Sequence, residues 1–226
     1  MELKSCVECN VRSTAAGFLE GEELDSMAEN CVEAHFDKGE VIFKQDALSS
    51  NNIYLKEGMV KLTMKGPYRD QILKIVKAPT YLGIPTTVGD KVNNYSAVAI
   101  NDAIACFIDL GTFQQLIHLN GKFAYEILLT LCKNELQQFH RCINLIQKNL
   151  NGRVAGTLLD FSRNIYQKKS FNLNLNRSDL ADLLGTSRES VSRIITEFSN
   201  EGLIKVSGKE VTIVEPEKLE KISKVG

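Results

Sequence analysis

The chain has 226 residues, a formal net charge of −1 and 43% hydrophobic residues, enough to form one large domain or two modest ones, each with its own core. No apolar run approaches the ~20 residues of a membrane-spanning helix, and the first residues, MELKSCVECNVRS, lack the apolar stretch of a secretory signal. Six cysteines without such a signal indicate a reducing compartment and not a disulfide framework. We therefore expect a cytoplasmic protein that has no membrane partner.

The first half of the chain has the pattern of a small β-domain. Residues 1–18 form a polar N-terminal segment that contains a C-x2-C pair, Cys6 and Cys9. A helix is predicted for residues 19–32, where Leu24 and Met27 are at helical spacing. Short strands with glycine-containing turns between them are predicted at 41–43, 53–55, 60–64, 71–76, 95–100 and 103–108. This pattern is typical of a barrel or roll, which we place at residues 19–120.

The middle of the chain, residues 121–149, is predicted to form one long helix. A short helix at 111–119 precedes it, and a hinge follows at 149–152. One face of the long helix is marked by residues spaced near 3.5 apart: Ile127, Leu131, Gln138, Cys142 and Leu145. Such a face either packs on the core of its own domain or pairs with the same helix of a second copy. Cys132 and Cys142 are about three turns apart and cannot bond to each other.

The last part, residues 150–226, has the pattern of a winged helix-turn-helix. A helix is predicted at 153–165, a strand around 171–175 and a hairpin wing at 203–214. Within the helix-turn-helix, Ser178 is the predicted N-cap of the first helix, and Gly185 ends that helix as its C′ residue. Thr186 or Ser187 is expected to open the second helix, and Thr186 with Glu189 has the spacing of a capping box. Two helices joined by a tight turn can place the second helix in a DNA major groove.

The run R-S-D-L-A-x-x-L-G-T-S-R-E-S-V-S-R resembles the helix-turn-helix of the Crp/Fnr family of bacterial transcription regulators. The resemblance covers nearly the whole chain, because Gly39, Gly58 and Gly83 lie where that family places its glycines. It implies an α+β chain with an N-terminal cyclic-nucleotide-binding-like β-roll (a double-stranded β-helix), a long dimerisation helix and a C-terminal winged helix-turn-helix. The implied protein is a homodimer that binds double-stranded DNA at an inverted repeat, contacts RNA polymerase and responds to an effector.

The resemblance also assigns roles to side chains of the second helix and its surroundings. The expected base contacts are Arg188, Glu189, Ser192 and Arg193, whose donors and acceptors suit base edges. The expected phosphate contacts are Arg177, Thr186, Ser187 and Ser190.

The sequence argues against cyclic AMP as the effector. Family members that bind it have a G-E pair and, about ten residues later, an R-S or R-T pair, whereas this chain has Gly83-Ile84 and Asn93-Asn94-Tyr95-Ser96. The glutamate for the ribose and the arginine for the phosphate are therefore both missing. A buried phosphate without its cation carries a large desolvation cost.

The cysteines indicate other possible cofactors. The oxygen-sensing Fnr branch holds an iron–sulfur cluster on the three cysteines of a C-x2-C-x5-C motif and on one distant cysteine. Cys6 and Cys9 match the first two cysteines of the motif, and Cys106 matches the distant one. The last cysteine of the motif is replaced by Ala15. Cys31 is the only nearby substitute, and we expect it on the core side of a helix as a buried hydrophobe. Zinc on Cys6, Cys9 and two other ligands is an alternative, although a redox pair or a remnant is favoured over both metals.

Haem is a further alternative, with His35, His118 and His140 as possible axial ligands. A rival of another class is a redox- or metal-binding sensor whose winged helix serves protein contacts. We do not expect an enzyme, since the chain has no phosphate loop, no paired acid and base and no nucleophile motif.

Overall fold

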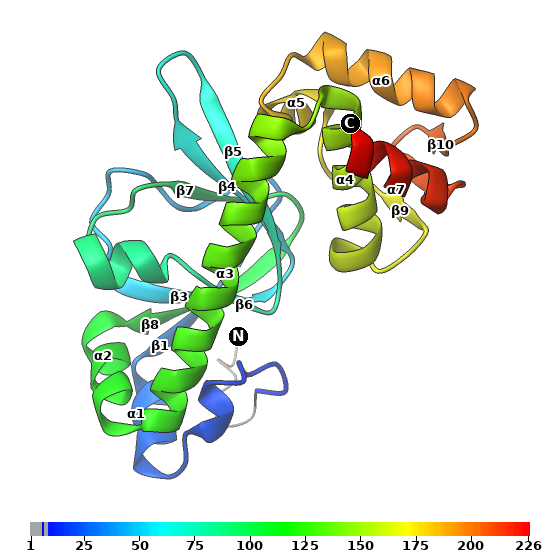
Figure 1. The fold of residues 1–226 in the computed structure, drawn as a ribbon. Coiled ribbons are helices and arrows are strands. Elements are labelled where there is room, and N and C mark those ends of the chain that lie inside the picture. Colours follow the sequence, from blue (N-terminus) through cyan, green and yellow to red (C-terminus); the bar gives the residue numbers. More distant parts are fainter. Residues whose placement is uncertain (1–5, 7–8) are drawn as a thin grey trace. The chain divides into compact units, whose positions relative to one another are not determined.

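The computed structural model of the chain describes Cys6 and residues 9–226, which form two compact units (Figure 1). The sensor domain extends to Glu135, and the C-terminal domain begins at Leu136 and includes residues 70–72. The long helix α3 (Gly121–Gln147) contributes to both units. Within the described residues, no helix is both long and apolar enough to cross a membrane.

The sensor domain consists of two four-stranded antiparallel sheets with helices at one face. The first sheet has the strand order β1-β8-β3-β6, and the second has the order β2-β7-β4-β5. The strands are β1 (Cys31–Phe36), β2 (Val41–Phe43), β3 (Asn51–Glu57), β4 (Met59–Lys65), β5 (Asp70–Lys77), β6 (Thr80–Leu82), β7 (Ser96–Ala99) and β8 (Ala103–Asp109). The helices are a 3-10 turn at Ala16–Phe18, α1 (Glu22–Glu29), a π-helical turn at Pro85–Asp90 and α2 (Leu110–Leu119).

The first sheet has an apolar core on each of its two faces, because successive side chains of a strand point to opposite sides. On β3, Ile53 and Leu55 pack with Val60 and Leu62 of β4 in the core between the two sheets. Tyr54 points the other way, into a second core that includes residues of α1, α2, α3 and the N-terminal segment. We call this second side the outer face of the first sheet.

Gly58 shows why the tight turns of the roll need glycine. Its φ of +89° is disfavoured for residues with a side chain, and a Cβ at this position would lie 2.5 Å from the carbonyl oxygen of Asp102. Gly39 and Gly83 also have positive φ angles.

The prediction of one helix over residues 19–32 is wrong at its C-terminal end. Helix α1 ends at Glu29, and Cys31 is the first residue of strand β1. Pairing of Cys31 with Ile108 and of Phe36 with Ala103 places β1 beside β8. These partners are more than sixty residues away in the chain, and helical periodicity over residues 19–32 gives no information about them.

The C-terminal domain contains the expected winged helix-turn-helix. Its elements are the end of α3, α4 (Leu150–Asp160), a π-helical turn (Phe161–Ile165), β9 (Ser170–Asn172), α5 (Arg177–Leu184), α6 (Arg188–Asn200), β10 (Ile204–Ser207), β11 (Glu210–Ile213) and α7 (Pro216–Val225). Strands β10 and β11 form the wing hairpin, and β9 pairs with β11 to complete a three-stranded sheet.

Helix α7 was not predicted, and it changes the interpretation of Gly152. The hinge prediction at 149–152 places Gly152 outside a helix, whereas the residue lies in α4, with Asn149 as the N-cap. A Cβ on Gly152 would lie 3.0 Å from the backbone of Gly226, and one on Gly156 would lie 2.9 Å from the Ser223 Oγ. These two glycines therefore allow α7 to pack closely against α4.

Candidate nucleic-acid interface and sensor face

The helix-turn-helix is fixed by local capping interactions at both of its helices. Asn176, and not Ser178, is the N-cap of α5: it accepts a hydrogen bond from the Asp179 amide at 2.9 Å, and Asp179 accepts one from the Asn176 amide at 3.1 Å. Ser187, and not Thr186, is the N-cap of α6 and accepts from the Ser190 amide at 3.2 Å. Gly185 ends α5 with a left-handed φ of +65°, as predicted.

Two arginines that the sequence analysis did not consider hold the C-terminal end of α5. Arg153 of α4 donates a hydrogen bond to the Leu184 carbonyl at 2.8 Å, and Arg141 of α3 donates one to the Leu183 carbonyl at 2.8 Å. The last carbonyls of a helix lack partners within the helix and carry partial negative charge, so cations are favoured there. Burial lowers the pKa of Arg141 from its ordinary value.

Helix α6 has one buried face and one free face. Val191, Ile194, Ile195 and Phe198 are buried and pack α6 into the C-terminal domain. The predicted base-contact residues Arg188, Glu189 and Arg193 are exposed on the other side, and Ser192 is half-buried between the two faces. Thr196, one turn beyond Ser192, is also exposed, although the sequence analysis had not assigned it a role.

The charged groups of α6 remain available to a ligand. The Arg193 guanidinium lies 3.8 Å from the Glu197 carboxylate at i,i+4 spacing, and its side chain is 71% exposed. Exposed pairs of this kind contribute little to stability, so Arg193 can exchange Glu197 for another acceptor. Hydrogen bonds from its own backbone amide and from Ser187 lower the pKa of Glu189, so its carboxylate stays an acceptor.

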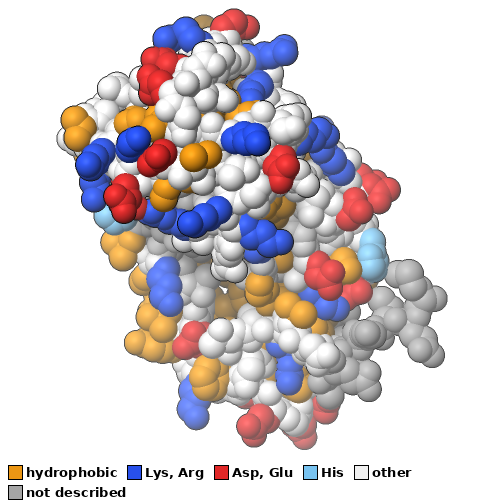
Figure 2. All heavy atoms as spheres, turned by 90° about the vertical axis from the view of Figure 1, so that its right-hand side faces the viewer, with side chains coloured by type: hydrophobic (Ala, Val, Ile, Leu, Met, Phe, Trp, Pro, Cys, Tyr) orange, Lys and Arg blue, Asp and Glu red, His pale blue; other side chains and the backbone are white. Residues whose placement is uncertain are grey.

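The predicted phosphate-contact residues surround the N-terminal ends of α5 and α6. Arg177 is the first residue of α5 and is half-buried, and Thr186, Ser187 and Ser190 lie at the turn and the first turn of α6. The Ser187 hydroxyl donates to the Ser190 hydroxyl at 3.1 Å. Over the upper part of Figure 2, lysine and arginine side chains lie among acidic ones, so the surface has mixed charge.

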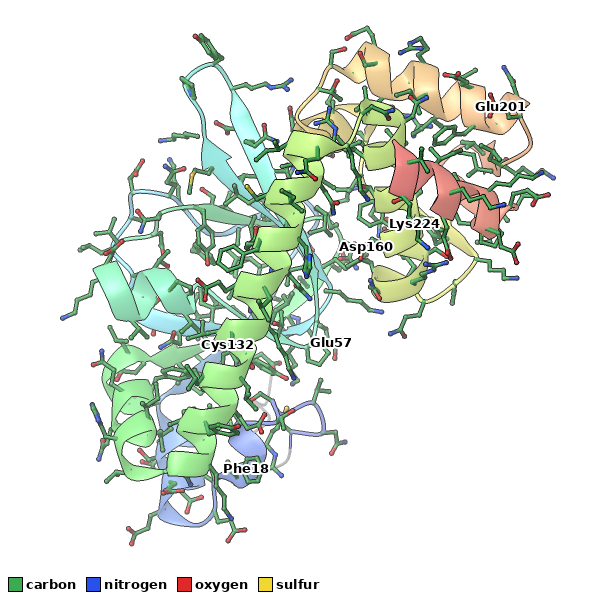
Figure 3. The ribbon with its side chains drawn as sticks, viewed as in Figure 1. Phe18, Glu57, Cys132, Asp160, Glu201 and Lys224 are labelled. Carbon is green, nitrogen blue, oxygen red and sulfur yellow. The ribbon has the colours of Figure 1, made fainter. Side chains whose placement is uncertain are left out.

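The predicted face of the long helix divides into two parts. Ile127 is buried and the partly buried Leu131 packs against the same outer-face core, which is the first of the two alternatives stated for this face. Gln138 and Cys142 are exposed, and Leu145 is half-buried. The free stripe consists of exposed residues three or four positions apart, including Cys132, which is labelled in Figure 3: Tyr125, Leu128, Cys132, Leu136, Phe139, Ile143 and Ile146.

Three of the six cysteines meet on the outer face of the first sheet. The Cys31 thiol is in hydrogen-bond contact with the thiols of Cys6 and Cys106. Cys106 lies opposite Glu33 of β1 and opposite Tyr54 of β3. The hydrogen bond from Cys31 lowers the pKa of Cys6 to about 7, and hydrogen bonds to Cys106 and Cys6 raise the pKa of Cys31. The expectation that Cys31 lies in a helix is wrong, because it is the first residue of β1, but it does pack against the outer-face core as expected.

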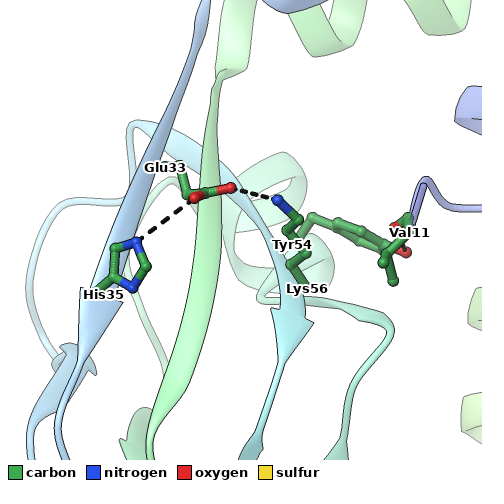
Figure 4. A network of polar contacts seen from close by, with 5 residues as sticks. All are labelled: Val11, Glu33, His35, Tyr54 and Lys56. Carbon is green, nitrogen blue, oxygen red and sulfur yellow. Dashed lines mark hydrogen bonds and ion pairs between the residues drawn. The ribbon is translucent and has the colours of Figure 1, made fainter. Parts of the chain in front are cut away.

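A polar network borders these cysteines (Figure 4). The Lys56 ammonium lies 2.6 Å from the Glu33 carboxylate, and His35 lies 3.6 Å from the other oxygen of Glu33. The Tyr54 hydroxyl donates to the Val11 carbonyl at 2.9 Å, which fixes the N-terminal segment on the sheet.

Comparisons with known proteins identify both domains. Residues 33–120 match the cyclic nucleotide-binding domain, and residues 152–222 match the Crp-like helix-turn-helix domain, so that the two matches together cover more than half of the chain. The chain belongs to the Crp/Fnr family of transcription regulators. As the sequence resemblance implied, it is a transcription regulator with a DNA-binding helix-turn-helix and an N-terminal domain of the effector-sensing type.

Similar family members span nearly the full length of the chain. The nitrogen fixation regulation protein FixK of Bradyrhizobium diazoefficiens is 24% identical and covers 96% of this chain and 93% of its own. The fumarate and nitrate reduction regulatory protein of Escherichia coli is 26% identical, with 92% and 86% covered. The solved structure of FixK2 from Bradyrhizobium japonicum is 19% identical, has a TM-score of 0.79 and covers 87% of this chain and 98% of its own; it shares the fold.

Within the Crp/Fnr roll, the positions that would hold a cyclic nucleotide have unsuitable side chains. Ile84 is buried where binding members have glutamate. In the segment 93–96, where binding members have the R-S or R-T pair, Asn94 donates to Asp90 at 2.6 Å. The only basic residue in 83–97 is Lys91, which is exposed. The site thus lacks the cation that a cyclic phosphate needs.

The other predicted cofactor ligands differ in how well they are placed. His35, His118 and His140 are all exposed, on β1, α2 and α3, which is a poor arrangement for an enclosed haem. Ala15, at the third ligand position of the Fnr branch, is buried and has no ligating atom. Of the ligand candidates that the sequence offers, the structure brings Cys6, Cys31 and Cys106 into contact. The Cys9 amide lies 3.4 Å from the Cys6 carbonyl.

Proposed function

We propose that the chain acts as a homodimer that binds an inverted-repeat operator, with one α6 helix reading each half-site. The observation that carries this proposal is the free face of α6, on which Arg188, Glu189 and Arg193 are exposed while the opposite face is buried. Arginine suits guanine O6 and N7, and glutamate suits cytosine N4. Arg177 and the hydroxyls around Ser187 are assigned to phosphates, where they set position and not sequence.

The apolar stripe on α3 supports the dimer. Leu128, Leu136 and Phe139 are each more than half exposed, and so is Ile146 near the end of the helix. Exposed apolar side chains at spacings of three and four residues are typical of helices that pair along their length. A symmetric pair of α3 helices gives two α6 helices related by a two-fold axis, and this symmetry matches half-sites about one helical turn apart.

We expect each half-site to contain a TGA-like core, as the resemblance to the family implies, and we expect RNA polymerase as a protein partner. The N-terminal domain supplies the signal. The change reaches the DNA-binding part where α3 ends at Gln147 and α4 begins at Leu150. Asn149 between them caps α4 by accepting a hydrogen bond from the Gly152 amide at 3.0 Å.

The decisive experiment selects bound sequences from a random duplex pool and then measures affinity for the selected site by fluorescence anisotropy at two salt concentrations. We expect an inverted repeat, an affinity that falls as salt rises, and loss of sequence preference in Arg193→Ala. Arg163→Ala is the matched control, because Arg163 is an exposed arginine of the C-terminal domain that pairs with Glu220 away from α6. Selection of the same site by Arg193→Ala would refute the assignment, and salt-independent or absent DNA binding would favour protein contacts for the winged helix.

A further inference from the structure

The free face of α6 carries acidic side chains beyond its last arginine. Glu197 and Glu201 line the same open groove on the surface of α6 as Arg193. Glu201 directly follows the last residue of the helix and is labelled at that end in Figure 3. Carboxylates repel the phosphates of DNA, so these two residues lower the affinity of the free face for the DNA backbone.

We propose that Glu197 is a positioning residue, which acts through Arg193 and directs its guanidinium to a guanine and away from phosphates. This inference rests on the proposed function, because it assigns part of the operator preference of α6 to a residue outside the expected base contacts. The E-x-x-S-R pattern that carries the family resemblance ends at Arg193 and does not include Glu197. Glu197 touches no base in this assignment.

The helix itself places the two side chains together. Residues four positions apart lie one turn from each other on the same side of a helix. The Nη1 atom of Arg193 lies 3.8 Å from the Oε2 atom of Glu197. Ile194 and Phe198, the next residues after these two, are buried and fix which side of α6 faces outward. The pair is therefore built into the secondary structure of the free face.

The chemistry of the guanidinium allows Glu197 and a guanine to be engaged at the same time. A guanidinium has five N–H donors, and a guanine edge uses two of them, at O6 and N7. While Nη1 of Arg193 lies beside Glu197, the donors on Nε and Nη2 remain for the guanine. A guanine edge has no net charge, whereas a phosphate has a full negative charge. A phosphate must therefore displace the Glu197 carboxylate or lie next to it.

The repulsion between carboxylate and phosphate gives the size of the effect. At a separation of roughly 7 Å in water, two negative unit charges repel each other enough to weaken binding about three-fold, and the loss grows as water leaves the groove. The exposed ion pair is itself weak, so the preference comes from this difference in charge between the two acceptors and not from the stability of the pair. Glu197 should thus raise the ratio of operator affinity to random-DNA affinity about three-fold.

The test uses the full chain and measures dissociation constants by fluorescence anisotropy, at one salt concentration, for the selected operator and for a random duplex. Glu197→Gln removes the charge and keeps the size and the helix propensity of the side chain. Glu201→Gln is the matched control, because it removes the same charge from the same groove about 12 Å further along the helix axis from Arg193. We expect the ratio of operator to random-DNA affinity to fall about three-fold in Glu197→Gln and to stay unchanged in Glu201→Gln.

A double-mutant cycle separates an action through Arg193 from a general effect of charge. In the Arg193→Ala background, Glu197→Gln should change the affinity for the random duplex no more than Glu201→Gln does. An unchanged ratio in Glu197→Gln, an equal fall in Glu201→Gln, or the full effect of Glu197→Gln without Arg193 would overturn the inference. Each of these results leaves the operator preference of the wild type intact, whereas a wild type without any operator preference would refute the proposed function as well.

Discussion

The apolar stripe on α3 gives a quantitative prediction for the dimer. Phe139 is 61% exposed. Full burial of an aromatic side chain removes ~200 Å² from water, so pairing of the helices can bury about 120 Å² more of Phe139 in each protomer. At ~25 cal/mol per Å², burial of this area contributes ~3 kcal/mol per protomer to dimer formation. Phe139→Ala removes ~2 kcal/mol of that contribution in each protomer, or about 4 kcal/mol per dimer. The dimer dissociation constant should therefore rise about a thousand-fold.

Sedimentation equilibrium over a range of protein concentrations measures this change. Leu119→Ala is the control, because Leu119 is 65% exposed at the end of α2 but lies outside the stripe. Circular dichroism should show the same helix content in the wild type and both variants. An unchanged dimer in Phe139→Ala, or equal weakening in Leu119→Ala, would contradict the assignment of the α3 stripe to the interface.

Three further substitutions test separate parts of the structure. Asn176→Ala removes the capping box of α5 and should lower the free energy of unfolding by ~1 kcal/mol, measured by urea denaturation, without altering operator sequence preference. Gly156→Val places its side chain against Ser223 and should destabilise the packing of α7 on α4 by ~1–3 kcal/mol, measured by thermal unfolding; an unchanged midpoint would contradict this contact. Tyr54→Phe removes the hydrogen bond to the Val11 carbonyl and should lower the free energy of unfolding by ~1 kcal/mol, measured by urea denaturation. Burial raises the pKa of Tyr54 to about 12. The hydrogen bond from Tyr54 to Val11 should therefore be fully stabilising below about pH 10, where the unfolded phenol ionises, and should be lost as the pH approaches 12. Ultraviolet titration should show a phenol that ionises near pH 12 in the wild type and is absent from Tyr54→Phe.

The helix-turn-helix could be predicted from sequence because its determinants are local. Gly185 ends α5 through its own backbone freedom, and the apolar residues from Val191 to Phe198 repeat within a few turns of α6. The errors there are small and have the same origin. Asn176 and Ser178 are both acceptable caps by residue type, and the reciprocal bonds with Asp179 decide between them.

The sensor face could not be predicted because it depends on long-range pairing. Residues just before Cys31 have helical spacing, so the sequence interpretation continued the helix through a residue that is the first of β1. Cys31 and Cys106 come to the same side of the sheet only once β1 is paired with β8, with Cys31 opposite Ile108 and Cys106 opposite Glu33. Likewise, the stripe on α3 was placed on Ile127 because one helix has several apolar rows, and only the packing of the sensor domain shows which row is already buried.

The alternation of β3 separates an apolar core from the face of the sheet that carries the cysteines. Ile53 and Leu55 point into the apolar core between the two sheets. Tyr54 and Lys56 point to the outer face, where the cysteines lie. The positions at which the glutamate and arginine are missing, Ile84 and the 93–96 segment, lie outside β3, so their substitution leaves the pairing of β3 with β8 and the direction of Tyr54 and Lys56 unchanged. Loss of the phosphate site and the presence of cysteines on the outer face are therefore separate features of this sensor domain.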